Sequence, residues 1–88
     1  MQIIIDPHTL QRAAERGAGK EEITETLQSG TLSIAKGGRK SKSKVYDFNK
    51  NWGGKHYEQK KIEVIFTEQG DSIITVTVYV FYGKWNES

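Results

Sequence analysis

The chain has 88 residues, which suffice for one domain spanning 1–88 and leave no room for a second independently folding core. It contains no cysteine, so disulfides and thiolate metal or redox chemistry are excluded. Hydrophobic residues make up 35% of the chain and charged residues 27%, which is typical of a soluble globular protein, and we expect a cytoplasmic one. We expect neither a membrane span nor a secretion signal, because the longest apolar stretch is short and the first residues lack a charged leader.

The net charge of +2 is distributed unevenly along the chain. Residues 36–61 contain nine Lys and Arg against two Asp and Glu, a net charge of +7, whereas the segments before and after them carry −2 and −3. A concentrated positive charge attracts polyanions, of which RNA is the first candidate, although a run of lysines is also typical of a solvated loop. The predicted RNA-binding residues are Lys36, Arg39, Lys40, Lys42, Lys44 and Lys61.

The first predicted element is a helix over residues 7–16. Asp6 can accept hydrogen bonds from the free N–H groups of the first turn, and Pro7 suits the first helical position. Gly17 ends the helix, because glycine readily adopts the left-handed conformation of a helix C-terminus. At 100° per residue the helix separates an apolar face of small side chains from an ionisable one. The ionisable face carries His8, Arg12, Glu15 and Arg16.

A second helix is predicted from Gly19 to Gly30, with acidic residues in its first turn and Ile23 and Leu27 as its buried pair. The hydrophobic pattern then changes from helical to alternating, which indicates strands separated by a flexible basic loop over 36–43. The expected fold is therefore α+β, with two N-terminal helices packed on one face of an antiparallel sheet of about four strands. The expected strands are 32–34, 45–48, 57–67 and 72–82.

Alternation in the last two strands predicts which residues face the helices. The final strand presents a branched apolar row formed by Ile74, Val76, Val78 and Val80. Pairing this row with the apolar residues of the preceding strand requires Phe66 opposite Ile74 and a three-residue loop over 69–71. The other face of the sheet then carries Thr77 opposite Glu63 and Tyr79 opposite Lys61.

Short motifs in a fixed order give this chain a resemblance to a known family. The pattern is His8-x3-Arg12-x3-Arg16-Gly17, then Glu21-Glu22-Ile23 at a helix start, then Gly30 and a closing Thr77-Val78-Tyr79. This layout resembles a bacterial family of domains of unknown function that looks related to the barnase, EndoU, colicin and RelE-like (BECR) toxin ribonucleases. The resemblance covers most of the chain. The sequence departs from the pattern at Ala18-Gly19 and in the longer, more basic segment after residue 36.

The resemblance implies a metal-independent ribonuclease, or a relative that has lost the activity. Such an enzyme takes a proton from the ribose 2′-hydroxyl, protonates the leaving oxygen and neutralises the charge on the phosphorane. His8 is the candidate acid–base group, because the positive end of the helix dipole attracts phosphate to its position. Arg12 and Arg16 are the candidate phosphate-binding cations, and Thr77 and Tyr79 are further catalytic candidates. Each of these residues also has a purely structural interpretation as surface charge or as a β-forming side chain.

The chain offers no metal site and no cofactor motif. Its two histidines lie 48 positions apart with no carboxylate at ligand spacing, and no phosphate-binding glycine loop is present. One alternative function is a non-catalytic nucleic-acid-binding module that uses the basic loop and the open sheet face. Another is a protein-interaction domain that pairs its sheet with another chain. The expected partners are RNA and, for a toxin, an acidic antitoxin or immunity protein that meets the positive segment.

Overall fold

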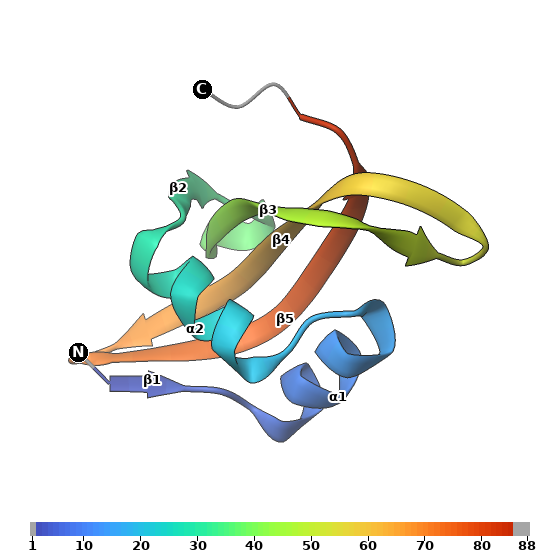
Figure 1. Cartoon of the computed structure of the whole chain (residues 1–88). Helices are drawn as coiled ribbons and strands as arrows, with labels where there is room; N and C mark the ends of the chain where they lie inside the picture. Colours follow the sequence, from blue (N-terminus) through green and yellow to red (C-terminus); the bar gives the residue numbers. More distant parts are fainter. Residues whose placement is uncertain (1, 86–88) are drawn as a thin grey trace.

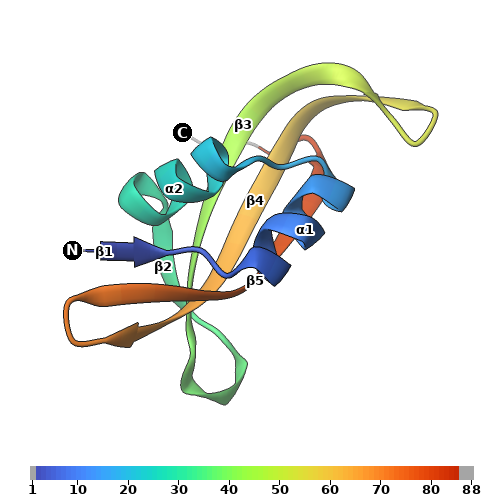
Figure 2. The ribbon, with the colours of Figure 1, turned by 90° about the horizontal axis from the view of Figure 1, so that it is seen from below.

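A computed structural model describes residues 2–85 and shows an α+β fold (Figure 1). Both helices lie on one face of the sheet, as predicted, and Figure 2 views the sheet from that side. Neither helix in this part of the chain has the length and hydropathy to cross a membrane. The elements are β1 (Gln2–Ile4), α1 (Pro7–Arg16), α2 (Lys20–Ser29), β2 (Thr31–Ile34), the short 3-10 turn Lys36–Gly38, β3 (Lys40–Trp52), β4 (Lys55–Gln69) and β5 (Ser72–Gly83).

The sheet has five strands in the order β1-β5-β4-β3-β2. Four of them pair antiparallel, as predicted, but β1 adds a parallel strand beside the start of β5, so the expectation of a wholly antiparallel sheet of about four strands was wrong. β1 contains three residues, which is too short for alternation to produce a pattern in the sequence. It covers residues 72–74 of β5 and leaves the rest of that edge to α1.

The two predicted helices are confirmed with their caps. The side chain of Asp6 accepts a hydrogen bond of 2.8 Å from the backbone N–H of His8, and Gly17 ends α1 with a positive φ of 91°. At the start of α2, Glu22 Oε1 accepts a hydrogen bond of 3.1 Å from the backbone N–H of Gly19. Thr9 and Ala13 are the buried residues of α1, so the helix lies close to the sheet through small side chains.

The hydrophobic core lies between the two helices and the covered face of the sheet. It draws on small residues of α1, on branched residues of α2 and on alternate positions of β4 and β5. Buried polar groups in this layer are hydrogen-bonded: the hydroxyl of Thr75 donates to that of Thr9 at 3.1 Å and accepts from the backbone N–H of Asp6 at 3.0 Å. The core residues are Ala13, Ala18, Ile23, Leu27, Ile62, Val64, Phe66, Ile73 and Val78.

The predicted register of the last hairpin was wrong by one residue beside the turn and by two residues beyond it. β4 and β5 are joined by the two-residue turn Gly70-Asp71, with φ of +57° at the glycine, so Thr67 lies opposite Ile74. A register shift between Phe66 and Ile65 adds the second residue and changes the alternation, so Glu63 lies opposite Tyr79 and Lys61 opposite Phe81. As a result Ile73 and Thr75 are buried in place of the predicted Ile74 and Val76, whereas Val78 is buried as predicted.

The basic segment is more ordered than expected. The predicted flexible loop 36–43 is confined to residues 36–39, because β3 begins at Lys40 and pairs with β4 from there on. Alternation along β3 places Lys40, Lys42 and Lys44 on the helix side of the sheet, opposite the apolar residues of β4. Ser41 and Ser43 therefore lie on the opposite side, which no helix covers.

Candidate functional site on the open sheet face

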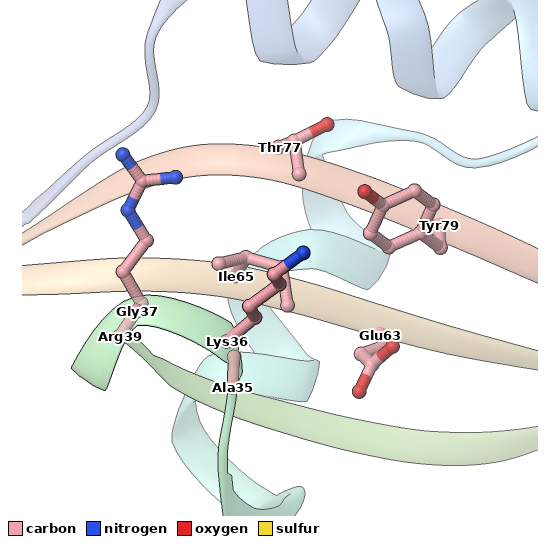
Figure 3. A pocket seen from close by; sticks show the side chains of 8 residues that line it. All are labelled: Ala35, Lys36, Gly37, Arg39, Glu63, Ile65, Thr77 and Tyr79. Carbon is pink, nitrogen blue, oxygen red and sulfur yellow. The ribbon is translucent and has the colours of Figure 1, made fainter.

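The face of the sheet away from the helices carries a hollow of about 570 Å³. β4 supplies Glu63 and Ile65, and β5 supplies Thr77 and Tyr79 (Figure 3). These four residues share the face because Glu63 pairs with Tyr79 and Ile65 with Thr77. The hollow therefore combines a carboxylate, two hydroxyls and an apolar floor.

Two cations reach over the hollow from the loop between β2 and β3. Figure 3 shows the side chains of Lys36 and Arg39 extending from this loop across the strands. The loop is held by a hydrogen bond of 2.6 Å from the backbone N–H of Ala35 to the carbonyl of Arg39, and Gly37 takes a positive φ of 76° inside it. Among residues 2–85, neither cationic side chain forms an ion pair or a hydrogen bond. Both charges are thus available to an anion in the hollow.

A third cation comes from α1 at the edge of β5. Arg16 Nη1 donates a hydrogen bond of 2.5 Å to the carbonyl of Val78, and its guanidinium carbon lies 5.6 Å from the centre of the Tyr79 ring. The hydroxyl of Tyr82 donates to the carbonyl of Arg16 at 2.6 Å, which ties the end of α1 to the same strand. These contacts hold Arg16 beside the hollow although it belongs to the helix layer.

Exposed aromatic rings extend the site along β5. Tyr79 and Phe81 are 43% and 48% exposed, and their ring centroids lie 6.4 Å apart. A second hollow begins at Glu63, which also borders the first, and continues past Lys61 and Phe81 to Trp85. The backbone N–H of Trp85 donates to the side chain of Gln59 at 2.6 Å, which holds the end of the described chain against β4. The open face therefore offers a row of rings flanked by cations, an arrangement suited to single-stranded nucleic acid.

The predicted site residues divide between the two faces of the sheet. The structure brings Thr77, Tyr79 and Arg16 together with the cations of the loop, and Lys61 joins them in the adjoining hollow. Lys40, Lys42 and Lys44 lie on the helix side and bond to groups there: Lys40 to Glu68 at 2.7 Å, Lys42 to the Leu27 carbonyl at 2.8 Å, and Lys44 to Ser29 at 3.2 Å.

His8 and Arg12 are exposed on α1 and do not line the described hollows. Arg12 lies 3.8 Å from Glu15 in an exposed ion pair of the i,i+3 type. Both residues lie on the flank of α1 that ends in Arg16, since the three positions follow at intervals of one turn. The flank therefore leads toward the hollow, and Arg16 at its end contacts Tyr79, which lines the hollow.

Sequence reasoning did not assign a role to Glu63, which is the carboxylate shared by the first two hollows. The signal was present, because Glu63 stands between the core residues Ile62 and Val64 and alternation places it on the open face. Trp85 was also outside the predicted site. The hairpin register decides how far along β5 the site extends, and that register could not be read from the pattern.

Within residues 2–85, no three His, Cys, Asp or Glu side chains lie close enough together to hold a metal ion. Comparison of the chain with protein-family models, with curated proteins and with solved structures found no match. The resemblance to the BECR ribonucleases therefore remains a prediction from the residues that carry it.

Proposed function

We propose that this protein is a small, metal-independent endoribonuclease that binds single-stranded RNA on its open sheet face. The observation that supports the proposal is the composition of the first hollow, which Glu63 and Tyr79 line together with the free cations Lys36 and Arg39. On this proposal the fold is a BECR fold of the RelE-like type.

The chemistry follows from what RNA cleavage needs. The ribose 2′-oxygen attacks the adjacent phosphorus and loses its proton to a base, the bond from phosphorus to the 5′-oxygen breaks, and that oxygen takes up a proton. Glu63 supplies the proton acceptor in the hollow, and Tyr79, which pairs with Glu63 on the neighbouring strand and lines the same hollow, supplies the proton donor. Lys36, Arg39 and Arg16 supply fixed positive charge for the phosphorane.

His8 offers a second acid–base group on the flank of α1. Arg16 lies eight positions further along the chain, a distance of about 12 Å along the helix axis. A reaction centred on His8 and Arg12 therefore requires RNA to pass around the edge of β5 and along α1. The two arrangements make different predictions, because the first depends on Glu63 and the second on His8.

Cleavage of a structured RNA in the presence of a chelator tests the proposal. We expect Glu63→Gln to lower the cleavage rate at least about 100-fold, the usual contribution of general acid–base catalysis. Glu58→Gln is the matched control, since Glu58 lies on the same strand in an exposed pair with Lys84 and outside the hollow. A rate lost in His8→Ala and kept in Glu63→Gln would move the reaction to the α1 flank. No cleavage by the unaltered protein would contradict the nuclease.

The exposed rings favour a second candidate, a non-catalytic module that binds single-stranded RNA. Stacking of bases on Tyr79 and Phe81 needs neither an acid nor a base, and it tolerates any sequence. Under this alternative the protein binds RNA without cleaving it, and Glu63→Gln binds at least as well as the unaltered chain because a negative charge has been removed from the hollow.

A nuclease of this kind needs an inhibitor in the cell that makes it, and we propose an acidic antitoxin or immunity protein. The positive segment 36–61 is the feature that supports an acidic partner. Co-expression with a candidate inhibitor should relieve toxicity and abolish cleavage by the purified complex.

A further inference from the structure

β2 forms an open edge of the sheet. The strand order places it last, and it pairs with β3 on one side and, within residues 2–85, with no strand on the other (Figure 1). All four of its residues, Thr31–Ile34, are exposed. An edge strand presents unpaired backbone N–H and C=O groups that a further strand can pair with. Edges of this kind are usually protected by charge, proline or a covering element, and β2 itself carries no charged residue or proline.

Two of the four side chains of this exposed strand are large and apolar. Leu32 is 55% exposed and Ile34 72%, the highest value among the large hydrophobic residues exposed in the described chain. Their partners in β3 are Lys42 and Lys40, so both point to the helix side of the sheet. Two exposed aliphatic side chains at alternate positions of an open edge indicate an interaction surface.

The positive charge beside β2 indicates an acidic partner. Residues 36–44 contain five Lys and Arg and no Asp or Glu. Lys40 and Lys44 are partly neutralised by pairs with Glu68 and Glu25, whereas Lys42, which bonds to a carbonyl, forms no ion pair within residues 2–85. Net positive charge therefore remains at this edge. Pairing with a second copy would bring two such positive segments together, which like-charge repulsion disfavours.

We propose that β2 binds an extended acidic segment of a partner protein as an additional strand. Backbone hydrogen bonds to Thr31–Ile34 provide the pairing, and apolar side chains at alternate positions of the segment pack on Leu32 and Ile34. Acidic residues between them lie on the open side of the sheet, where Lys36 and Arg39 of the segment 36–44 carry free positive charge. Strand pairing at the edge does not depend on RNA cleavage, which we propose for the open face.

A set of synthetic peptides tests the proposal. The probes are hexapeptides that alternate Glu with Val in either register, a scrambled version of the same composition, and a version with N-methyl groups on all of its amides, so that neither edge of the peptide can donate hydrogen bonds. Hydrogen exchange is followed with peptide at about 1 mM, where even weak specific binding is populated. We expect the alternating peptides to slow the exchange of amides in β2, and we expect the scrambled and N-methylated peptides to leave them unchanged. No protection of β2 by any alternating peptide would overturn the proposal.

Variants distinguish strand addition from attraction by charge alone. The double variant Leu32→Thr/Ile34→Thr keeps the strand propensity and removes the apolar contacts, and we expect it to weaken peptide binding at least 10-fold. Ile4→Thr is the matched control, since Ile4 is an exposed residue of β1 at the opposite edge of the sheet. Equal binding by the double variant, or equal binding of scrambled and alternating peptides, would overturn strand addition. Association of the protein with itself at rising concentration, lost in the double variant, would replace the acidic partner with a second copy. RNA cleavage measured in the same variants should not change, so failure here and failure of the nuclease can be told apart.

Discussion

Lysine and tyrosine side chains have different roles on the two faces of the sheet: they stabilise the fold on the helix side and are available to a ligand on the open side. On the helix side, Lys60 is 7% exposed, lies 2.9 Å from Glu22 and donates to the carbonyl of Gly17 at 2.8 Å. On the open side its neighbour Lys61 borders two hollows and forms no ion pair within residues 2–85. One lysine thus joins the helices to the sheet, and the adjacent one remains available to a ligand.

The tyrosines of β5 show the same division. Tyr82 faces the helices, stacks on Trp52 at 5.0 Å and donates to the carbonyl of Arg16. Tyr79 is 43% exposed on the open face, beside Phe81. A side chain type therefore says little about function in this protein. The parity of its position in the strand decides whether it stabilises the fold or faces the candidate site.

The largest expected effect is on stability and separates Lys60 from Lys61. Lys60→Ala removes a buried cation, leaves Glu22 without its partner and the Gly17 carbonyl without a donor, and should lower the free energy of unfolding by about 2–3 kcal/mol. Lys61→Ala should change it by less than about 0.5 kcal/mol. Urea denaturation of the two variants measures the difference. Similar losses in both variants would contradict the division of the two faces.

The next effect is on RNA affinity and separates Tyr79 from Tyr82. Tyr79→Ala removes a stacking surface and should weaken binding of single-stranded RNA by about 1–3 kcal/mol with little change in stability. Tyr82→Phe removes one hydrogen bond to the Arg16 carbonyl and should cost about 1 kcal/mol of stability while leaving RNA affinity unchanged. Fluorescence anisotropy with a labelled oligonucleotide and thermal unfolding give the two readouts. RNA affinity that depends on Tyr82 and not on Tyr79 would place binding on the helix side.

A smaller effect is expected from the cations of the basic segment. Lys36→Ala/Arg39→Ala removes two free charges beside the hollow and should reduce the slope of log affinity against log salt by about 1.4, since each single-strand phosphate contact contributes about 0.7. Lys40→Ala/Lys44→Ala is the matched pair on the helix side, where both lysines already contact carboxylates. Its salt slope should stay closer to that of the unaltered protein. Equal salt slopes in the two double variants would mean that the cations of residues 36–44 contribute alike to RNA binding, whichever face of the sheet they lie on.

In the part of the hairpin that carries the site, the face of each residue could be predicted although the register could not. There the predicted pairing of β4 with β5 was wrong by two residues, an even number, so Thr77 and Tyr79 still fell on the open face with Glu63. Nearer the turn it was wrong by one residue, and the predicted faces of Ile73 and Thr75 were wrong. The two-residue turn and the register shift near Val76 depend on how the strands fit under the helices. Both involve contacts between distant residues, and no local pattern reports them.

The distribution of the basic residues was harder to predict. Residues 40–43 contain only lysine and serine, so the sequence offers no apolar side chain to bury and predicts a flexible loop there. Pairing with the apolar strand β4 outweighs that preference and places Lys42 opposite Val64. Once the segment is a strand, alternation places Lys40, Lys42 and Lys44 together on the helix side. The contact of Arg16 with Tyr79 could not be predicted for a similar reason, because it depends on the packing of α1 against the edge of β5.

The smallest expected effect is a loss of stability at high pH that comes from the helix side alone. Burial raises the pKa of Tyr46 from 10.0 to about 12, and its hydroxyl donates to the carbonyl of Glu22 and lies 3.0 Å from the Thr26 hydroxyl. The neutral phenol is favoured in the folded state, so its contribution is fully present below pH 10 and is lost as the pH rises from about 10 toward about 12. Tyr46→Phe should flatten the fall of the melting temperature over that range. An unchanged pH profile in Tyr46→Phe would show that the Tyr46 hydroxyl does not cause the alkaline loss.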